Sequence, residues 1–265
     1  MKAYDFEYDG IRLSDKGFLI CEFNTSGLVT SSNGSQVTLN TVSTLRGSKH
    51  ELVSSEYTER IEATFQICKS ACDNETMEIS ATELRDIARW LNRKSFFPFR
   101  FIGDSEYEDV YFNASFNLQK IKLGGSLIGI ELSMITDMPF GYKAPITLTL
   151  TNSSKNGTAT ITDESDDEGF VYPHTEITLR SAGNLTIHNA LENRDTYIAN
   201  CSSGEVITMD YPIISTSTSS HEIQNDFNWN FFRIANTFEN SVNNLTISLP
   251  CTIKITYSPS VKIGI

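Results

Sequence analysis

Apolar and polar residues alternate along most of this chain, which predicts a mainly β protein. Residues 60–68, for example, place an apolar side chain at every second position from Ile61 to Ile67, as a strand with one buried face does. In the first half this period predicts strands at Phe18–Phe23, Arg60–Cys68, Tyr107–Leu118 and Leu127–Met134. Gly124 and Gly125 separate the last two and suit a tight hairpin turn, because glycine adopts positive φ without strain.

One segment follows the helical period instead. Its apolar residues fall at i, i+3, i+4 and i+7, which predicts a helix over residues 80–92 with one apolar face. The residues of that face are Leu84, Ile87, Ala88 and Leu91. Ser80 stands three residues before Glu83, the spacing of a capping box. A single amphipathic helix among strands is expected to lay its apolar face on a sheet and close the core.

The second half shows the strand period alone. Its short alternating runs are Ile146–Leu150, Glu176–Leu179, Leu185–His188, Tyr197–Asn200, Val206–Asp210, Phe227–Ile234, Leu245–Leu249 and Cys251–Tyr257. Their spacing predicts a two-sheet, jelly-roll-like β-sandwich. Two prolines and a glycine at Thr136–Pro145 indicate the domain boundary. We therefore expect a β-sandwich-like N-terminal domain at 1–139 with one flanking helix, and a C-terminal sandwich at 140–265.

The segment Thr25–Ser48 departs from both patterns. It is rich in serine, threonine, asparagine and glycine, and its few apolar residues are Val37, Leu39, Val42 and Leu45. A stretch so poor in core residues is either a mobile loop or an extended hairpin that finds its partner on another subunit. Both interpretations stay open at the level of sequence.

Charge and cysteine content narrow the possible partners. The formal net charge is −12, and dividing the chain at Gly141 leaves −6 in each half, with no basic cluster. Binding to nucleic acid or anionic lipid needs clustered lysine and arginine, so neither is expected. The N-terminus lacks an apolar export signal, and no run is long enough for membrane insertion. The five cysteines are expected to be reduced, and the Cys68–Cys72 spacing lacks the second pair that zinc requires.

Residue types used in catalysis occur without a catalytic pattern. No nucleophile, zinc or phosphate-loop motif is present, and Asp210 and Asp226 are expected at turns or strand ends. The acidic run Asp163–Glu168 could bind Ca²⁺, but it lacks the ordered spacing of a calcium loop, so a solvated hairpin tip is favoured. The histidines show no pairing, and each is expected at the surface or an edge; they are His50, His174, His188 and His221. We expect no enzyme, metal or cofactor.

The most aromatic stretch is Phe227–Ile234, with Trp229 near its centre. As a strand it would carry Phe227, Trp229 and Phe231 on one face, in the manner of a sugar-stacking platform. Phe232 would lie on the other face. Apolar residues on both faces are typical of a buried central strand, and we favour that interpretation.

Several stretches together resemble the siphophage distal tail protein family. In the first half the matching runs are FEYDGIRLSDKGFLICEF, HELVSSEYTERIEATFQIC, ELRDIARWLN and FRFIGDSEYEDVYFNASF. In the second half they are YPHTEITLRSAGNLTIHN, CSSGEVITMDY and NDFNWNFFRIANTFENSVNNLTISLPCTIKITY. The resemblance covers nearly the whole chain in the family's order. The polar Thr25–Ser48 segment and the acidic loop depart from it.

The resemblance implies a structural role in the virion. It implies a tail-tube-like, ring-forming N-terminal domain followed by a galectin-like sandwich. Proteins of this family form hexameric rings at the tail tip, enclose the DNA channel and join the tail tube to the adhesion (baseplate) proteins. The implied partners are the tail tube protein and a tail-associated or fibre protein, with the tape-measure and receptor-binding proteins as further candidates. Assembly would take place in the host cytoplasm, and DNA would pass without specific binding.

The resemblance also suggests a place for the polar segment. Val37–Leu45 would belong to a hairpin that completes a neighbouring subunit's sheet edge, which makes a directional ring contact. The alternative function is a carbohydrate-binding module that recognises host cell-surface glycan, because β-sandwiches host both roles.

Overall fold

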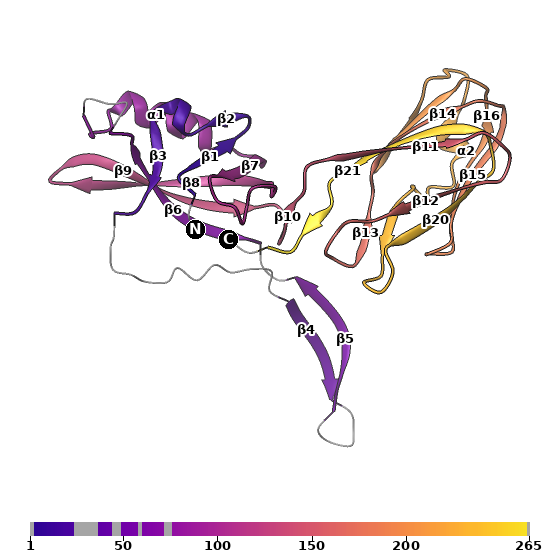
Figure 1. The fold of residues 1–265 in the computed structure, drawn as a ribbon, viewed down its shortest axis with the longest axis horizontal. Helices are drawn as coiled ribbons and strands as arrows, with labels where there is room; N and C mark the ends of the chain where they lie inside the picture. Colours follow the sequence, from indigo (N-terminus) through magenta and orange to yellow (C-terminus); the bar gives the residue numbers. More distant parts are fainter. Residues whose placement is uncertain (1–2, 24–36, 44–48, 58–59, 72–75, 264–265) are drawn as a thin grey trace. The chain divides into compact units, whose positions relative to one another are not determined.

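The computed structural model describes residues 3–23, 37–43, 49–57, 60–71 and 76–263. The chain divides into two compact units, each with its own buried core (Figure 1). The first unit runs to Lys143 and takes in the chain again from Val261, and the second comprises Ala144–Ser260. Two short strands, β10 (Gly141–Tyr142) and β22 (Ser260–Val261), lie where the chain passes from one unit to the other. The domain boundary between residues 139 and 140 stays a prediction.

The first unit is built on a seven-stranded antiparallel sheet in the order β2-β1-β7-β8-β9-β6-β3. Its strands are β1 (Asp5–Tyr8), β2 (Ile11–Arg12), β3 (Phe18–Cys21), β6 (Glu62–Lys69), β7 (Phe97–Ile102), β8 (Phe112–Leu123) and β9 (Ser126–Thr136). A 3-10 turn, η1 (Ser14–Lys16), connects β2 to β3. The Ile20 amide donates to the Tyr4 carbonyl at 3.0 Å. Because this bond brings β3 beside the start of β1, the sheet rolls around a central core.

An aromatic cluster fills the inside of this rolled sheet. Its members are Phe6, Phe65, Phe99, Phe101 and Phe116, all buried. Their ring centroids lie 4.7–6.4 Å apart, mostly in edge or tilted geometry. Each such pair contributes about 0.5–1.5 kcal/mol beyond its burial. Because these rings come from four strands that are distant in sequence, the cluster connects the two ends of the unit's chain.

One strand of the first unit differs from the sequence-based expectation. The strand expected from Tyr107 begins only at Phe112. Before it the chain turns, with the Tyr107 amide bonded to the Asp104 carbonyl and the Val110 amide to the Tyr107 carbonyl. Tyr107 and Val110 are buried although they lie in a turn and not in a strand. Their apolar side chains extended the alternating pattern, so the strand was predicted to begin too early. The predicted hairpin turn is present, with Gly124 and Gly125 both at positive φ.

Helix α1 (Ala81–Leu91) begins at a complete capping box. The Ser80 hydroxyl accepts from the Glu83 amide at 3.2 Å, and the Glu83 carboxylate accepts from the Ser80 amide at 2.7 Å. The Lys69 ammonium on β6 lies 2.8 Å from the Glu83 carboxylate, and this contact is the main reason that the pKa of Glu83 is lowered. The backbone amides at the start of the helix therefore have hydrogen-bond partners within the capping box, and the ion pair with Lys69 joins the same end of the helix to the sheet.

The inner face of α1 packs against the aromatic core, and Figure 1 shows the helix lying across one side of the sheet. Ile87, Trp90 and Leu91 are buried, and Leu84 packs against the same core. Ala88 is only half-buried. The Trp90 indole donates to the Tyr8 carbonyl at 3.2 Å, so the helix also satisfies a backbone group of β1. Among the described residues, no helix is long and apolar enough to cross a membrane.

The second unit is a two-sheet β-sandwich, which confirms the predicted mainly β fold class. One sheet has the order β11-β21-β14-β17-β18 and the other β12-β20-β15-β16. The five-stranded sheet contains β11 (Ile146–Asn152), β14 (His174–Leu179), β17 (Val206–Asp210), β18 (Ile213–Thr216) and β21 (Cys251–Tyr257). The four-stranded sheet contains β12 (Gly157–Thr162), β15 (Gly183–Asn189), β16 (Arg194–Cys201) and β20 (Val242–Ile247). A separate pair joins β13 (Gly169–Val171) to β19 (Ile234–Asn236).

Strict alternation along these strands makes the sandwich core. On β15, for example, Leu185 and Ile187 are buried while Thr186 and His188 face outward. The core side chains of the two sheets are mainly isoleucine and leucine, which suit a pleated surface buried on one side.

The expected strand at Phe227–Ile234 is wrong. A one-turn helix, α2 (Ile223–Asp226), precedes an irregular segment, and strand geometry begins only at Ile234. Phe227 and Phe231 are buried, but Trp229 between them is 57% exposed. Trp229 has φ +59°, in the left-handed region. Because the segment is irregular, it can bury neighbouring residues such as Phe231 and Phe232. Its apolar residues therefore appeared on both faces of the predicted strand.

Candidate assembly site

An exposed hairpin is the first candidate site. Strands β4 (Val37–Ser43) and β5 (His50–Tyr57) pair antiparallel, with a register shift between Asn40 and Thr41. Part of the polar segment, Val37–Ser43, is thus one strand of a hairpin. A partner for this hairpin on another subunit stays a prediction. Within the described ranges, β4 and β5 pair with each other and with no third strand. Such a two-stranded ribbon is marginally stable without a further partner.

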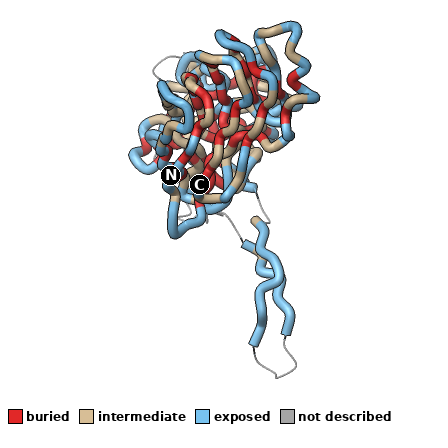
Figure 2. Tube along the Cα trace, turned by 90° about the vertical axis from the view of Figure 1, so that its right-hand side faces the viewer, coloured by how far each residue is buried: buried red, intermediate tan, exposed pale blue. Residues whose placement is uncertain are grey.

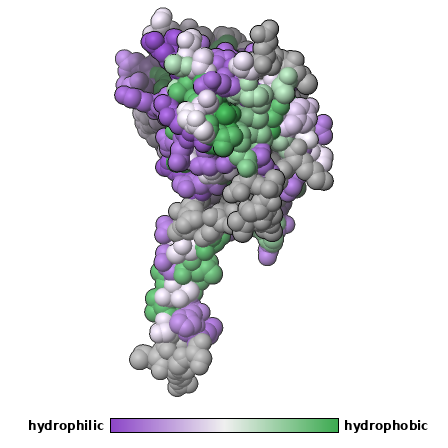
Figure 3. All heavy atoms as spheres, turned by 90° about the vertical axis from the view of Figure 1, so that its left-hand side faces the viewer, coloured by the Kyte–Doolittle hydropathy of each residue, from purple (hydrophilic) through white to green (hydrophobic). Residues whose placement is uncertain are grey.

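The hairpin is exposed to solvent along its described length (Figure 2), and hydrophobic residues lie on its surface (Figure 3). Their exposed fractions run from 51% to 66% and belong to Val37, Leu39, Val42, Leu52 and Val53. By alternation Val37 and Leu39 share a face, while Val42 lies on the opposite one. Leu45, the fourth residue proposed for this site, lies outside the described residues. Exposed apolar side chains beside open strand edges are typical of a surface that another chain covers.

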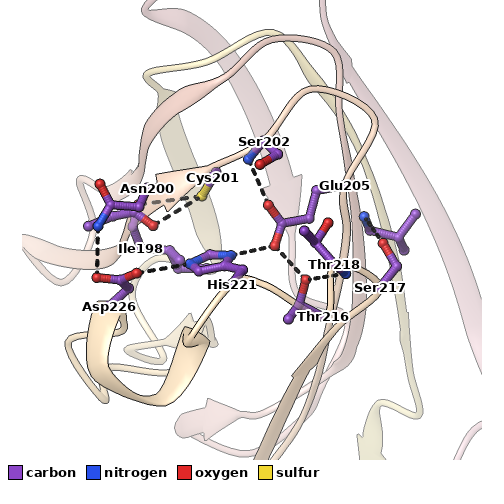
Figure 4. Close-up of polar contacts among 12 residues, drawn as sticks. Ile198, Asn200, Cys201, Ser202, Glu205, Thr216, Ser217, Thr218, His221 and Asp226 are labelled. Carbon is purple, nitrogen blue, oxygen red and sulfur yellow. Dashed lines mark hydrogen bonds and ion pairs between the residues drawn. The ribbon is translucent and has the colours of Figure 1, made fainter.

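A buried polar cluster in the second unit is the other candidate (Figure 4). His221 Nδ1 lies 2.5 Å from Glu205 Oε1, and His221 Nε2 lies 3.3 Å from Asp226 Oδ2. Only 3% of the His221 side chain is exposed, and none of the Glu205 side chain. Asn200 donates its amide to the Asp226 carboxylate at 3.0 Å. The expectation that every histidine lies at the surface or an edge is therefore wrong for His221.

The carboxylate of Glu205 is held by several donors at once. The Ser202 amide donates to Oε2 at 2.7 Å, and the Thr216 hydroxyl and His221 ring bond to Oε1. Burial alone would raise the pKa of Glu205, but these donors outweigh it, so the pKa is lowered. A charged group enclosed in this way connects β17, β18 and the segment before α2. The cluster fits a structural brace better than a site for a substrate.

No local pattern marks this cluster in the sequence. Glu205, Thr216, His221 and Asp226 are spaced without period, and their contact depends on the β17–β18 hairpin and the turn that follows. Asp226 ends α2, and its main partners are Asn200 and His221.

The other sequence-based candidates have structural explanations. Asp163 in the acidic run is buried, where its carboxylate accepts from the Ser165 hydroxyl and the Asn236 amide. Cys68 is a buried free thiol, and Cys72 lies outside the described residues. In the part of the chain that the structure describes, no group of three or more His, Cys, Asp or Glu side chains could hold a metal ion.

Comparison with known proteins identifies the family of this chain. A family model described as a phage tail protein N-terminal domain matches residues 1–138, and one described as a phage tail C-terminal domain matches residues 140–257. The chain belongs to this phage tail protein family. No curated protein matches the tail protein in sequence.

One of the two solved structures compared shares the fold of this chain. The Dit protein (gp 19.1) of phage SPP1, described as a paradigm of the hub adsorption apparatus in phages that infect Gram-positive hosts, matches with a TM-score of 0.64 and 12% identity. That match covers 97% of the tail protein and 99% of the SPP1 chain. A chain of the phage p2 baseplate matches with a TM-score of 0.46 and 11% identity, over 96% and 97% of the two chains.

These findings confirm the resemblance to siphophage distal tail proteins. The tail protein is a structural component of the phage virion, as predicted. The part played by Val37, Leu39, Val42 and Leu45 in subunit contact stays a prediction.

Proposed function

We propose that this tail protein forms a hexameric ring at the tail tip, joins the tail tube to the adhesion proteins and encloses the DNA channel. In this proposal residues 1–139 form the ring and residues 140–265 form the galectin-like domain. The partners are the tail tube protein and a tail-associated or fibre protein, with the tape-measure and receptor-binding proteins as further candidates. Assembly takes place in the cytoplasm of the bacterial host, and the role is structural and not enzymatic.

The exposed β4–β5 hairpin is the observation that carries this proposal. It offers apolar side chains and open strand edges, and a neighbouring copy would cover both. A contact between one patch on a subunit and a different patch on the next is head-to-tail, and such contacts close into a ring when the rotation permits. The fold shared with SPP1 Dit, a hub protein, supports the same role.

The net charge suits a DNA channel. Six copies of a chain at −12 carry a formal −72. Carboxylates that face the channel repel phosphate, so DNA would slide through without adhering. A channel surface dominated by lysine and arginine would contradict this part of the proposal.

The mass of the purified protein in solution tests the ring. Multi-angle light scattering should give six times the chain mass of 29.6 kDa. Deletion of Val37–Leu45 should leave monomers that retain the β circular dichroism spectrum of the parent. A hexamer that persists after the deletion would refute the role of the hairpin, and a parent that stays monomeric even when mixed with its tail tube partner would refute the ring.

A further inference from the structure

Strand β8 has neighbours on both of its edges only in its first part. Strand β7 pairs with it at residues 112–114, and the Asn92 side chain then donates to the Phe116 carbonyl at 3.1 Å. From residue 117 to residue 123, β8 pairs with β9 alone, and its backbone bonds to no further part of the chain that the structure describes. Figure 1 shows the β8–β9 hairpin extending past the neighbouring strands. We call residues 117–123 the open edge of β8.

An open strand edge presents unpaired N–H and C=O groups, to which another strand can add. Lys120 and Lys122 lie on the open edge of β8, and both are exposed. Lysines at such a position prevent pairing with a second copy of the same edge, because like charges would meet. They do not prevent pairing with an acidic strand, so the open edge of β8 selects its partner by charge.

Alternation gives the open edge of β8 one charged face and one apolar face. Phe116 is buried in the core, and Lys120 and Lys122 share its face because they follow at even spacing. The register shift near the end of the hairpin adds its extra residue to β9, so the alternation of β8 continues through it. Ile121 and Leu123 lie on the opposite face, where 70% of Leu123 is exposed.

Strand β5 of the exposed hairpin is divided in the same way. Glu56 lies opposite Thr38 and Glu51 opposite Val42. Because Thr38 and Val42 share a face of β4, the two glutamates share a face of β5. The register shift within β5 produces this arrangement, since a spacing of five residues would otherwise direct the glutamates to opposite faces. Leu52, which is 59% exposed, lies on the other face.

The two strands are therefore complementary on both faces. With β5 beside the open edge of β8, Glu51 and Glu56 lie on the side of the lysines, and opposite charges on neighbouring strands attract. Leu52 lies on the side of Ile121 and Leu123. Strand β5 has eight residues, enough to pair along the whole open edge. Strand β4 has no charged side chain and offers no such match.

We infer that β5 of a second copy adds to the open edge of β8. The donor hairpin and the acceptor edge are different surfaces of the chain, so the contact is head-to-tail and can be repeated around a ring. This inference rests on the proposed ring, and it names the surface that receives the hairpin.

Reversal of the charges tests the pairing in the full-length protein. Lys120→Glu with Lys122→Glu should reduce the light-scattering mass to that of a monomer, and Glu51→Lys with Glu56→Lys should do the same. All four substitutions together should restore the mass of the parent, because each charge again faces its opposite. Lys94→Glu with Lys155→Glu is the matched control. It reverses two exposed lysines outside both strands and should leave the mass unchanged.

Carbodiimide coupling locates the contact. The reagent joins a lysine amine to a carboxylate that touches it, forming an amide bond with loss of water. In a mixture of ¹⁵N-labelled and unlabelled protein, mass spectrometry should find Lys120 or Lys122 of one copy coupled to Glu51 or Glu56 of a differently labelled copy.

The inference requires both results. It is overturned if no such peptide forms between copies, or if the fourfold variant does not regain the mass of the parent. The ring is judged separately from the mass of the parent protein. A hexamer without the coupled peptide would leave the ring standing and remove the β8 edge as its acceptor, whereas a parent that stays monomeric beside its tail tube partner and yields no coupled peptide would remove both.

Discussion

The side-chain amide of Asn243 pairs with both backbone groups of Ala235. Asn243 Nδ2 donates to the Ala235 carbonyl and Asn243 Oδ1 accepts from the Ala235 amide, each at 2.9 Å. Asn243 has no exposed surface, and its oxygen also accepts from Asn189 at 2.8 Å. The Asn243 side chain on β20 thus bonds to Ala235 as a neighbouring strand would, and it links β19 to β20.

Asn243→Ala should therefore destabilise the second unit by about 3 kcal/mol, because it leaves buried backbone groups of Ala235 without partners. Trp229 fluorescence in a Trp90→Phe background reports denaturant unfolding of this unit. Asn244→Ala is the matched control, since Asn244 is exposed on the next position of the same strand, and it should cost less than ~0.5 kcal/mol. Equal stabilities of the two variants would contradict the role given to Asn243.

Acid should weaken the second unit through Glu205. The pKa of Glu205 in the folded protein is lowered from its ordinary value of 4.5. The ionised carboxylate therefore stabilises the folded state fully at pH values above the pKa that Glu205 has in the unfolded chain. This stabilisation is lost as the pH falls through the lower pKa of the folded protein. At pH 7, Glu205→Gln should cost about 3 kcal/mol by breaking the buried pair with His221.

The difference between parent and Glu205→Gln should then shrink as pH falls from 7 toward 3. Denaturant unfolding at a series of pH values measures it. A difference that stays constant over this range would show that the Glu205 carboxylate is not what responds to acid. Glu222→Gln, at an exposed position, is the control and should leave the curve unchanged.

Removal of the helix cap should lower the stability of the first unit. Ser80→Ala deletes the hydroxyl that accepts from the Glu83 amide, and loss of such a cap costs about 1 kcal/mol. Trp90 lies in α1, so its fluorescence in a Trp229→Phe background follows the unfolding. Thr82→Ala, at an exposed position of the first turn, should be nearly neutral. If Ser80→Ala and Thr82→Ala both had the same free energy of unfolding as the parent, the cap would make no contribution to stability.

The exposed apolar residues of the hairpin should control assembly. Leu39→Asp places a charge among the exposed apolar residues of β4, which should reduce the light-scattering mass to that of a monomer while the melting temperature stays unchanged. Thr82→Asp adds the same charge at an exposed position of α1, outside the hairpin. It should keep the hexamer. Loss of assembly in both variants would indicate a general effect of charge and not a specific contact.

Local features of this protein are determined by its sequence. The predicted strand bounds at Val206–Asp210 and Cys251–Tyr257 agree with the structure to the residue, because both strands bury one face and alternate strictly. The start of α1 follows from Ser80 and Glu83, whose mutual bonds are three residues apart. Periodicity and capping depend on neighbours in the chain, and the sequence displays them directly.

Tertiary structure decided the rest. Strand β1 pairs with β7 across more than ninety residues, with Asp5 opposite Ile102, and neither short segment shows a decisive period of its own. His221 is buried because Glu205 and Asp226 compensate its polarity, although an isolated histidine reads as a surface residue. Trp229 is exposed on an irregular segment that Asn228 joins to β16, and its ring packs on Phe227 and Phe231. In each case the partner that decides the environment lies far along the chain or on a separate element, and a local pattern carries no information about it.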